Sequence, residues 1–317
     1  MHALAVVALA TTAGFVLLRL APGDPLTVAA AQQGALDAPA RQALRARQGL
    51  DEPVARQYAR FVRGALRGDL GTSLAEGRPV GALLRPALAR SALLSGAGLA
   101  LAVVLGVGVG SLQGWRPGGL AGRVLGNGLT GLYAVPEFVL AVALSGLLAA
   151  RLRLFPTGGL ADPVLSLVGT PGEQLADRAW HLVLPALTLA LGWGAAIARQ
   201  QRVALLEVAG DDFVRTARAK GLADGAVFGR HAFRAALPGT VAVVGLMLPV
   251  LVGGAVVVEA LYSWPGMGSL LLQAVLLRDY PVVSGALVVV GAAVTLASLL
   301  TDLVVAWLDP RRRADAG

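Results

Sequence analysis

Three carboxylates lie within or beside long apolar stretches of the chain and are the first residues that could do chemistry: Glu137, Glu259 and Asp302. A charge inside a bilayer is costly and often marks a substrate path or a proton relay. A structural or interfacial carboxylate is the alternative, and we favour it for each of the three. A proton-coupled carrier would show more charged groups deep in its apolar stretches, so their scarcity argues against such a carrier.

Residues for catalysis or metal binding are scarce elsewhere too. The chain has no cysteine, and its three histidines, His2, His181 and His231, lie far apart. None of them has the spacing of a metal site. The sequence also lacks a GxxxxGK[ST] phosphate loop, a GxSxG nucleophile turn and an HExxH zinc motif. We therefore expect no metal site, no cofactor and no enzyme activity in this chain.

A basic segment between two apolar stretches is the remaining candidate. It runs from Phe213 to Pro238, reads FVRTARAKGLADGAVFGRHAFRAALP and contains the only lysine of the chain. Small residues followed by Gly221 predict a short helix over residues 216–221. A second helix is predicted over residues 223–236. Its apolar face consists of Val227, Phe228, Ala232, Phe233 and Leu237.

The residues of this segment allow two interpretations. Basic side chains beside a membrane could bind anionic lipid headgroups. A short helix of small side chains could instead enter a groove in a partner protein. The segment by itself supports both interpretations equally. The candidate docking residues are Arg215, Thr216, Ala217, Arg218, Ala219, Lys220 and Gly221.

The amino-acid composition indicates that the helices that position these candidate residues lie in a membrane. The 317 residues are 56% hydrophobic and 15% charged, whereas soluble domains are about 25% charged. Such a chain could not cover itself with polar surface in water, so we expect a membrane protein. Its net charge of +8 would suggest nucleic-acid binding in a soluble protein. A positive-inside bias explains the charge more simply, and no nucleic-acid partner is expected.

A membrane helix needs roughly 20 mostly apolar residues, and six stretches qualify. They are residues 3–20, 91–112, 125–150, 180–198, 237–261 and 282–308. The sequence therefore predicts an all-α polytopic fold with about six transmembrane helices. The first stretch could be a signal peptide, but no basic residues precede its apolar run, so we expect an uncleaved span. Because this stretch is short and lacks N-terminal arginines, the true start of the chain stays open.

Basic residues predict the orientation of the spans. If the N-terminus is cytoplasmic, the inside loops hold twelve basic residues and the short outside loops hold four. We therefore expect both termini in the cytoplasm. The predicted organisation is a first span at residues 1–20, an outer segment at 21–90, a five-helix core at 91–308 with a cytoplasmic loop at 199–237, and a cytoplasmic tail at 309–317. The outer segment carries ten arginines, but it is longer than the loops to which the charge rule applies.

The predicted outer segment has helical features of its own. Asp37 is suited to cap a helix that ends at Gly49, and Asp51 with Pro53 begins a second one. We expect two amphipathic helices that pack against the bundle rather than contact a partner.

Several glycine, aromatic and aspartate residues in and between the apolar stretches predict how the helices pack and end. Gly106 and Gly110 form a small-xxx-small pair, which indicates close helix packing. Tyr262 and Trp264 are expected at a membrane interface, where amphipathic rings are common. Asp279 is expected to cap the last span.

At this point the sequence resembles a known family. FVRTARAKGL followed by RHAFRAALP resembles the cytoplasmic signature loop of ABC importer permeases of the dipeptide, oligopeptide and nickel branch. Four further motifs of that branch follow the same order: RLAPGDP at Arg19, GDLGTS at Gly68, YSWPGMGSLLLQAVLLRDYPVV from Tyr262 and LDPRRR at Leu308. The resemblance covers almost the whole chain, although the N-terminus is shorter than is usual for the branch.

The resemblance implies a type I ABC importer permease in the inner membrane, without an ATPase site of its own. It implies a second permease subunit, expected to be a different chain, two cytosolic ATPase subunits that bind ATP and Mg²⁺, and an extracytoplasmic substrate-binding protein. Residues 215–221 would form a coupling helix that docks on an ATPase subunit and ends at Gly221. The helix over 223–236 would hold it against the bundle.

Peptides are the expected substrates, with nickel chelates and glutathione-like molecules as alternatives within the branch. A stand-alone ion-coupled carrier or channel is a rival function, and the ordered basic segment argues against it. A membrane enzyme is a second rival, and the missing catalytic motifs argue against it.

Overall fold

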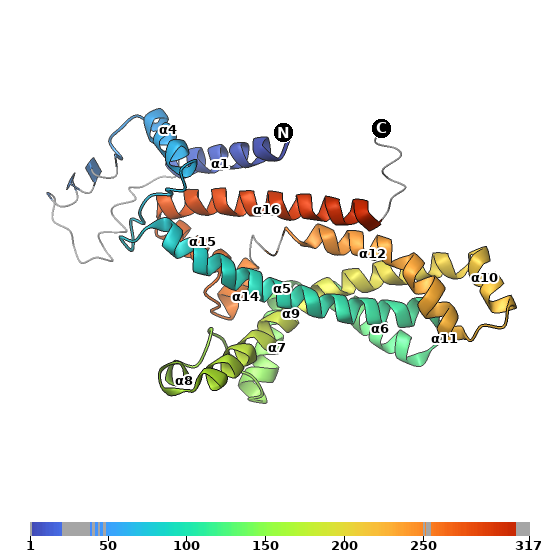
Figure 1. Ribbon diagram of the computed structural model, residues 1–317. Coiled ribbons are helices and arrows are strands. Elements are labelled where there is room, and N and C mark those ends of the chain that lie inside the picture. Colours follow the sequence, from blue (N-terminus) through green and yellow to red (C-terminus); the bar gives the residue numbers. More distant parts are fainter. Residues whose placement is uncertain are drawn as a thin grey trace. The chain divides into compact units, whose positions relative to one another are not determined.

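The computed structural model describes residues 2–20, 39, 42–43, 45–46, 49–249, 251 and 255–308. Within these residues the only extended pairing is an isolated bridge between Thr72 and Pro79. All regular structure in the described chain is otherwise helical, which confirms the predicted all-α class (Figure 1).

The helices alternate between long apolar rods and short connecting turns. They are α1 (His2–Leu20), α4 (Val54–Ala65), α5 (Val80–Trp115), α6 (Leu120–Tyr133), α7 (Glu137–Leu144), α8 (Pro163–Val168), α9 (Pro171–Ala209), α10 (Asp212–Ala219), α11 (Asp224–Val227), α12 (Phe233–Met247), α14 (Val256–Leu261), α15 (Met267–Leu276) and α16 (Tyr280–Leu308). Two π-helical turns, η1 (Ser145–Arg151) and η2 (Phe228–Ala232), continue α7 and join α11 to α12.

The number of spans differs from the sequence prediction. Among the described residues, three helices are long and apolar enough to cross a membrane: α5, α9 and α16. A fourth crossing exists if α6 and the α7–η1 helix count as one broken span. The predicted count of six is therefore not confirmed, although all six apolar stretches contain helix.

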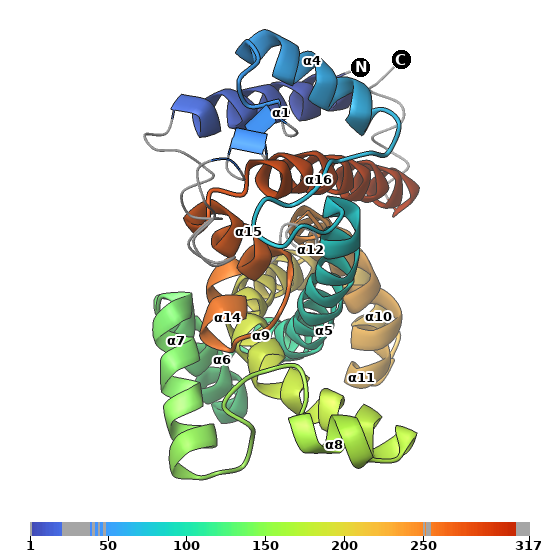
Figure 2. The same ribbon diagram turned by 90° about the vertical axis from the view of Figure 1, so that its left-hand side faces the viewer.

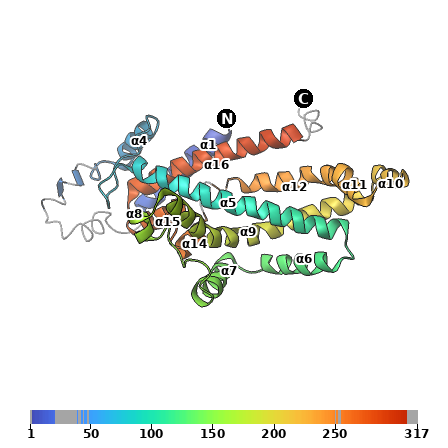
Figure 3. The same ribbon diagram turned by 60° about the horizontal axis from the view of Figure 1, so that its bottom comes forward.

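The predicted third span, residues 125–150, is wrong as a single straight helix. The axis bends by 115° between α6 and the helix that begins with α7. Pro136 stands at the N-cap of α7, and a proline there removes a backbone donor and disfavours helical geometry in the residue before it. Figure 3 shows α6 running alongside α9 while α7 turns aside.

The predicted fifth span, residues 237–261, is also wrong as a single helix. Helix α12 begins four residues earlier, at Phe233, and ends at Met247. A separate short helix, α14, follows at Val256. The helix predicted over residues 223–236 therefore does not stop before the span but continues into it through η2.

The chain divides into two compact units. The first comprises residues up to 91, 252–256 and 265–296, and the second comprises residues 92–251, 257–264 and 297–317. In the second unit, α6 and α12 each pack along α9.

Glycines bring α5 and α9 into close contact within the second unit. A β-carbon on Gly106 would lie 2.7 Å from the carbonyl oxygen of Gly194, and one on Gly110 would collide with the carbonyl oxygen of Ala198. The predicted small-xxx-small pair is thus confirmed as a packing surface. Lipid tails are as apolar as the helices, so association depends on such close backbone contact rather than on a hydrophobic drive.

Helices α1, α4 and α16 pack together within the first unit (Figure 2). Gly14 of α1 abuts the side chain of Leu287 on α16. Phe15 of α1 is 2% exposed, and its ring lies 5.2 Å from that of Tyr58 and 5.7 Å from that of Phe61 on α4. The second predicted outer helix therefore exists and packs on the bundle as expected. The first, which Asp37 was expected to cap, lies largely outside the described residues.

Replacing Gly106 with alanine tests the α5–α9 contact. The added methyl group meets backbone on α9, so we expect the protein to lose about 1–3 kcal/mol of stability, as for other overpacked sites. Unfolding of the purified protein in mixed micelles with increasing SDS measures this loss.

Gly108→Ala is the matched control on the same helix. A β-carbon on Gly108 meets nothing within 4 Å, and alanine is the better helix former by about 1 kcal/mol. We expect this variant to unfold at the same or a higher SDS fraction than the wild type. Equal loss in both variants would contradict the packing role.

Candidate functional site

Helix α10 forms the tip of the turn that joins α9 to α12 (Figure 1). Helix α9 continues to Ala209, and α10 starts at Asp212 after a turn at Gly210. The connecting segment is thus shorter than the predicted loop at residues 199–237, because its first residues extend α9. Helix α10 itself begins three residues before the predicted start of the docking helix.

Gly221 ends α10 in the way the sequence predicted. Its φ of +76° lies in the left-handed region, which costs a residue with a β-carbon strain that glycine avoids. The N–H of Gly221 donates to the carbonyl of Arg218 at 3.0 Å, and the N–H of Leu222 donates to that of Ala217 at 3.4 Å. This pair of bonds is the Schellman motif, which satisfies carbonyls that the helix end leaves open.

One face of α10 is anchored in an apolar cluster. Val214 and Ala217 are buried at 0% and 5% exposure. They pack with Leu205 of α9 and with three buried residues of the following helix, Val227, Ala232 and Ala236. Ala217 was among the predicted docking residues, and the structure places its side chain on this buried inner face.

A polar network fixes α10 to the end of α5. The indole N–H of Trp115 donates to Asp224 Oδ2 at 2.8 Å, and Arg218 pairs with Asp224 Oδ1 at 3.6 Å. The Arg218 guanidinium also lies 4.8 Å from the centre of the Trp115 ring. The side chain of Arg218, like that of Ala217, therefore contacts the neighbouring helices of the same unit. The sequence analysis missed Trp115 and Asp224, because Trp115 is separated from Asp224 by 109 positions and no local pattern connects them.

The other face of α10 is open and carries the remaining candidates. Arg215, Thr216, Ala219 and Lys220 are all exposed. Two large apolar side chains flank them, Phe213 at 44% exposure and Leu222 at 40%. Such a surface of small, basic and apolar side chains on a braced helix is suited to bind a groove in another protein. We call these six residues the α10 face: Phe213, Arg215, Thr216, Ala219, Lys220 and Leu222.

The three candidate carboxylates lie on three different helices. Glu137 occupies the first turn of α7 and is exposed. Glu259 is fully buried on α14. Asp302 lies on α16, with its side chain outside the described residues. Among the described residues no group of three potential metal ligands comes together.

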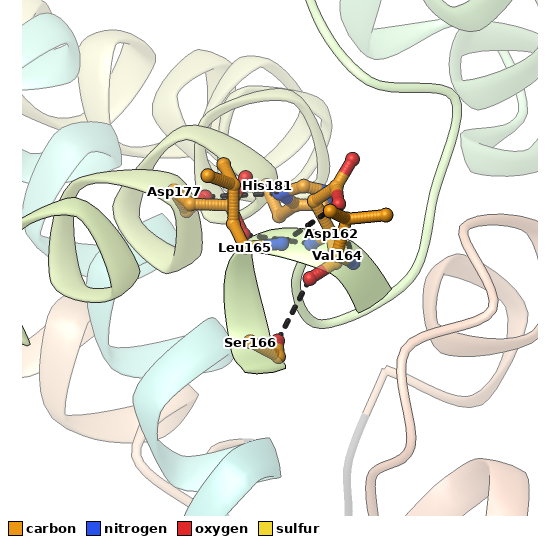
Figure 4. A network of polar contacts seen from close by, with 6 residues as sticks. All are labelled: Asp162, Val164, Leu165, Ser166, Asp177 and His181. Carbon is orange, nitrogen blue, oxygen red and sulfur yellow. Dashed lines mark hydrogen bonds and ion pairs between the residues drawn. The ribbon is translucent and has the colours of Figure 1, made fainter. Parts of the chain in front are cut away.

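A loop network orders the connection between η1 and α9 (Figure 4). Asp177 accepts a hydrogen bond from the N–H of Asp162 at 2.7 Å and lies 3.2 Å from His181 Nδ1. Asp162 in turn caps α8 by accepting from the N–H groups of Val164 and Leu165 at 2.7 and 3.1 Å. Asp177 thus fastens the loop to α9, and His181 is a structural residue that supports Asp177 from the next turn of the same helix.

Tyr262 and Trp264 are not interface residues, contrary to the sequence prediction. Both are only 1% exposed. The Tyr262 hydroxyl donates to the carbonyl of Ala141 at 3.0 Å and lies 3.0 Å from the Thr188 hydroxyl. The Tyr262 hydroxyl contacts α7 and α9 at the same time, so this side chain joins the two helices instead of facing lipid headgroups.

Asp279 does more than the predicted capping of α16. It accepts from the N–H of Val282 at 3.4 Å, as a cap does. It also accepts from the Ser73 hydroxyl at 2.5 Å and from the N–H groups of Leu74 and Ala75 at 3.1 and 3.2 Å. Two of the motifs noted in the sequence, GDLGTS and the end of the stretch that begins at Tyr262, therefore meet at one buried carboxylate within the first unit.

Comparison with known proteins places these features in context. Residues 98–314 match the family model described as "Binding-protein-dependent transport system inner membrane component". The chain is 38% identical over 299 residues to a Brucella ovis protein provisionally named a peptide permease, covering 94% of this chain and 92% of that protein.

Two further relatives carry more specific names. The dipeptide transport system permease protein of Escherichia coli is 35% identical, with 94% of this chain and 92% of that protein covered. The oligopeptide transport system permease protein of Bacillus subtilis is 33% identical, with 95% and 93% covered.

Gly221→Ala tests whether the left-handed turn secures α10. A side chain at this φ costs about 1–2 kcal/mol, although a β-carbon there would touch nothing within 4 Å. We expect amide hydrogens of residues 212–222 to exchange roughly 5 to 30 times faster, as measured by hydrogen–deuterium exchange.

Gly225→Ala is the control for this measurement. It also adds a methyl group that meets nothing within 4 Å, but on helix α11 and without a positive φ. Exchange in α10 should then stay at the wild-type rate. Equal acceleration in both variants would show that the left-handed turn is not what secures the helix.

Asp279→Asn tests the junction between the two motifs. The amide replaces a buried acceptor that receives four hydrogen bonds, so we expect a loss of about 1–3 kcal/mol and faster proteolysis near residues 69–79. Asp69→Asn is the comparison, since Asp69 is exposed and accepts only from the N–H of Gly71 among the described contacts. A thermal unfolding midpoint that falls no further for Asp279→Asn than for Asp69→Asn would refute the role of the buried carboxylate.

Proposed function

Because the chain belongs to the family of binding-protein-dependent transport system inner membrane components, we propose that it is the permease subunit that carries peptides through an ATP-driven importer. It is a multi-pass helical membrane protein and a component of an ABC transport system. The peptide substrate is inferred from the names of the dipeptide and oligopeptide permeases that align along almost their whole length.

The α10 face is the observation that carries the proposal. A permease without an ATPase site needs a surface through which a partner's motion reaches the spans. Helix α10 supplies a short exposed surface at the tip of the α9–α12 turn, with its inner side packed on Leu205 and Val227. A displacement of α10 would therefore be transmitted to α9 and α12 rather than absorbed by a flexible loop.

The partners follow from this role. The α10 face would dock on one of two cytosolic ATPase subunits, which bind ATP and Mg²⁺. A second permease, a different chain, would complete the translocation path. A binding protein would deliver the peptide from the opposite side of the membrane. In this arrangement both termini and α10 lie in the cytoplasm of a cell whose inner membrane holds the protein.

The proposed cycle uses differential binding of two conformations. ATP binding closes the ATPase pair, and the closed pair holds α10 in a position that favours the outward-facing arrangement of the spans. Hydrolysis opens the pair and returns α10, which favours the inward-facing arrangement. A ligand shifts such an equilibrium only through its different affinity for the two states, so firm attachment of α10 to α9 and α12 is required for coupling.

Charge reversal on the α10 face tests the docking role. We would replace Arg215 and Lys220 together with glutamate in the complete transporter, reconstituted in liposomes with its binding protein. Neither residue belongs to the buried cluster, so the spans should fold normally. We expect recovery of the ATPase subunits with the permease and ATP-dependent uptake of a labelled dipeptide to fall by roughly tenfold or more, which corresponds to about 1.4 kcal/mol.

Arg178→Glu is the matched control. Arg178 is exposed near the start of α9, whereas α10 follows the end of that helix, so its reversal should leave ATPase recovery unchanged. Gly221→Pro, in a variant verified to insert and fold, should abolish both ATPase recovery and ATP-dependent uptake, because proline cannot adopt the φ of +76°. Full uptake without ATP would refute the importer, and normal ATPase recovery by the double variant would refute docking through the α10 face.

A further inference from the structure

A cavity of about 350 Å³ opens in the first unit beside the ends of α1 and α4 and the start of α16. Phe15 and Arg19 of α1, Phe61 and Arg63 of α4, and Tyr280 of α16 line parts of its wall. Nothing in the transport cycle described above uses this cavity. Its lining is both aromatic and basic.

The charge of the lining is strongly positive. Four arginines contribute to it, Arg19, Arg60, Arg63 and Arg67, against one carboxylate, Asp69. Arg60 pairs with Glu52. In the described part of the chain no carboxylate forms an ion pair with the other three arginines. The described lining therefore carries a net positive charge that a bound anion could neutralise.

Arg19 is held in place as a binding residue would be. Its Nε and Nη2 atoms both donate to Gln57 Oε1, at 3.0 and 2.8 Å. The amide of Gln57 is itself fixed by donating to the carbonyls of Leu50 and Glu52 at 3.2 and 2.8 Å. The guanidinium lies 3.5 Å from the centre of the Phe15 ring. Side chains locked by surrounding contacts in this way are preorganised for a ligand.

One donor of Arg19 has no partner within the described chain. The Nη1 atom is buried and makes no hydrogen bond. Buried polar groups are nearly always satisfied, and an exception calls for an explanation such as an absent ligand. An anion in the cavity would supply the missing acceptor, and guanidinium groups bind phosphate oxygens particularly well.

The surroundings indicate which anion this is. Arg19 occupies the last turn of α1, at one end of an apolar helix, where lipid headgroups are found. Leu17 and Leu20 of the same helix are 65% and 73% exposed, so α1 also presents an exposed apolar side next to this end. From this combination we propose that the cavity binds the phosphate of an anionic phospholipid, with an acyl chain lying along the exposed side of α1.

Lipid retention by the purified complex tests the proposal. We would delipidate the complete transporter in detergent, add phosphatidylglycerol or zwitterionic phosphatidylcholine, and count bound lipids by native mass spectrometry. We expect the wild type to retain phosphatidylglycerol preferentially. Arg19→Gln and Arg63→Gln should each weaken this retention by roughly fivefold, since one basic residue near anionic lipid contributes about 1 kcal/mol.

Two variants make the comparison specific. Arg63 is exposed and lies outside the described ion pairs, so its replacement reports on the cavity even if Arg19→Gln fails to fold. Arg56→Gln removes an exposed arginine of the same helix that does not line the cavity. We expect Arg56→Gln to retain phosphatidylglycerol like the wild type.

Three outcomes would overturn the proposal. Equal retention of the two lipids, or equal loss in Arg56→Gln and Arg63→Gln, would show that the cavity has no headgroup site. Displacement of the lipid by glycerol phosphate at similar concentration would show that a free anion is the ligand. Displacement by an acidic dipeptide would assign the cavity to transport instead. None of these readouts depends on the α10 face or on ATP hydrolysis.

Discussion

The second unit depends on how closely α5 approaches α9. Side chains at Gly98, Gly106, Gly110 or Gly114 would meet α9 at less than 3 Å, so the two backbones run nearly in contact along this stretch. Lipid does not drive helices together by the hydrophobic effect, and close packing must supply the attraction. Helix α5 ends at Trp115, shortly before Pro117, and Trp115 is the residue that reaches Asp224.

Helix α10 is braced on other helices although it lies at the tip of a turn. Its inner face packs on residues of α9 and of the helix that leads into α12. Arg218 adds a third attachment, to α5, because its guanidinium lies over the Trp115 ring and pairs with Asp224, which accepts from Trp115. A helix attached to three others moves with them, and its exposed side remains available for a partner. Rigid attachment and open surface are the two properties that a mechanical coupling element needs.

Much of the fold follows from local sequence patterns, but the site follows only in part. The apolar stretches predicted helices, Gly221 predicted the end of α10, and Gly106 with Gly110 predicted a packing surface, because each depends on neighbours within a few positions. The sequence did not predict the breaks in the third and fifth apolar stretches, because apolar composition shows how long a stretch is but not whether its helix is continuous. The burial of Tyr262 and the inward face of Ala217 depend on contacts with residues distant in sequence.

Charge and exposure were harder to anticipate still. Asp279 was recognised as a helix cap, yet its bonds to residues 73–75 require knowing that two distant segments meet. Asp224 was expected only as part of a helix. The role of a carboxylate depends on which hydrogen-bond donors surround it. Donors that come from distant segments cannot be recognised in the sequence next to the carboxylate.

The π-helical turn η2 fixes the number of residues between two buried positions, Val227 and Ala232. Val227 and Ala232, which flank its interior, are both 0% exposed although they are five positions apart, and Ala236 follows at four. In an uninterrupted α-helix, five positions would carry Ala232 well off the face of Val227. The extra residue of the π turn returns it to the same side. A single deletion within this turn would therefore rotate everything from Phe233 onward by about a quarter to a third of a revolution relative to α10, because each α-helical residue turns the chain by about 100°.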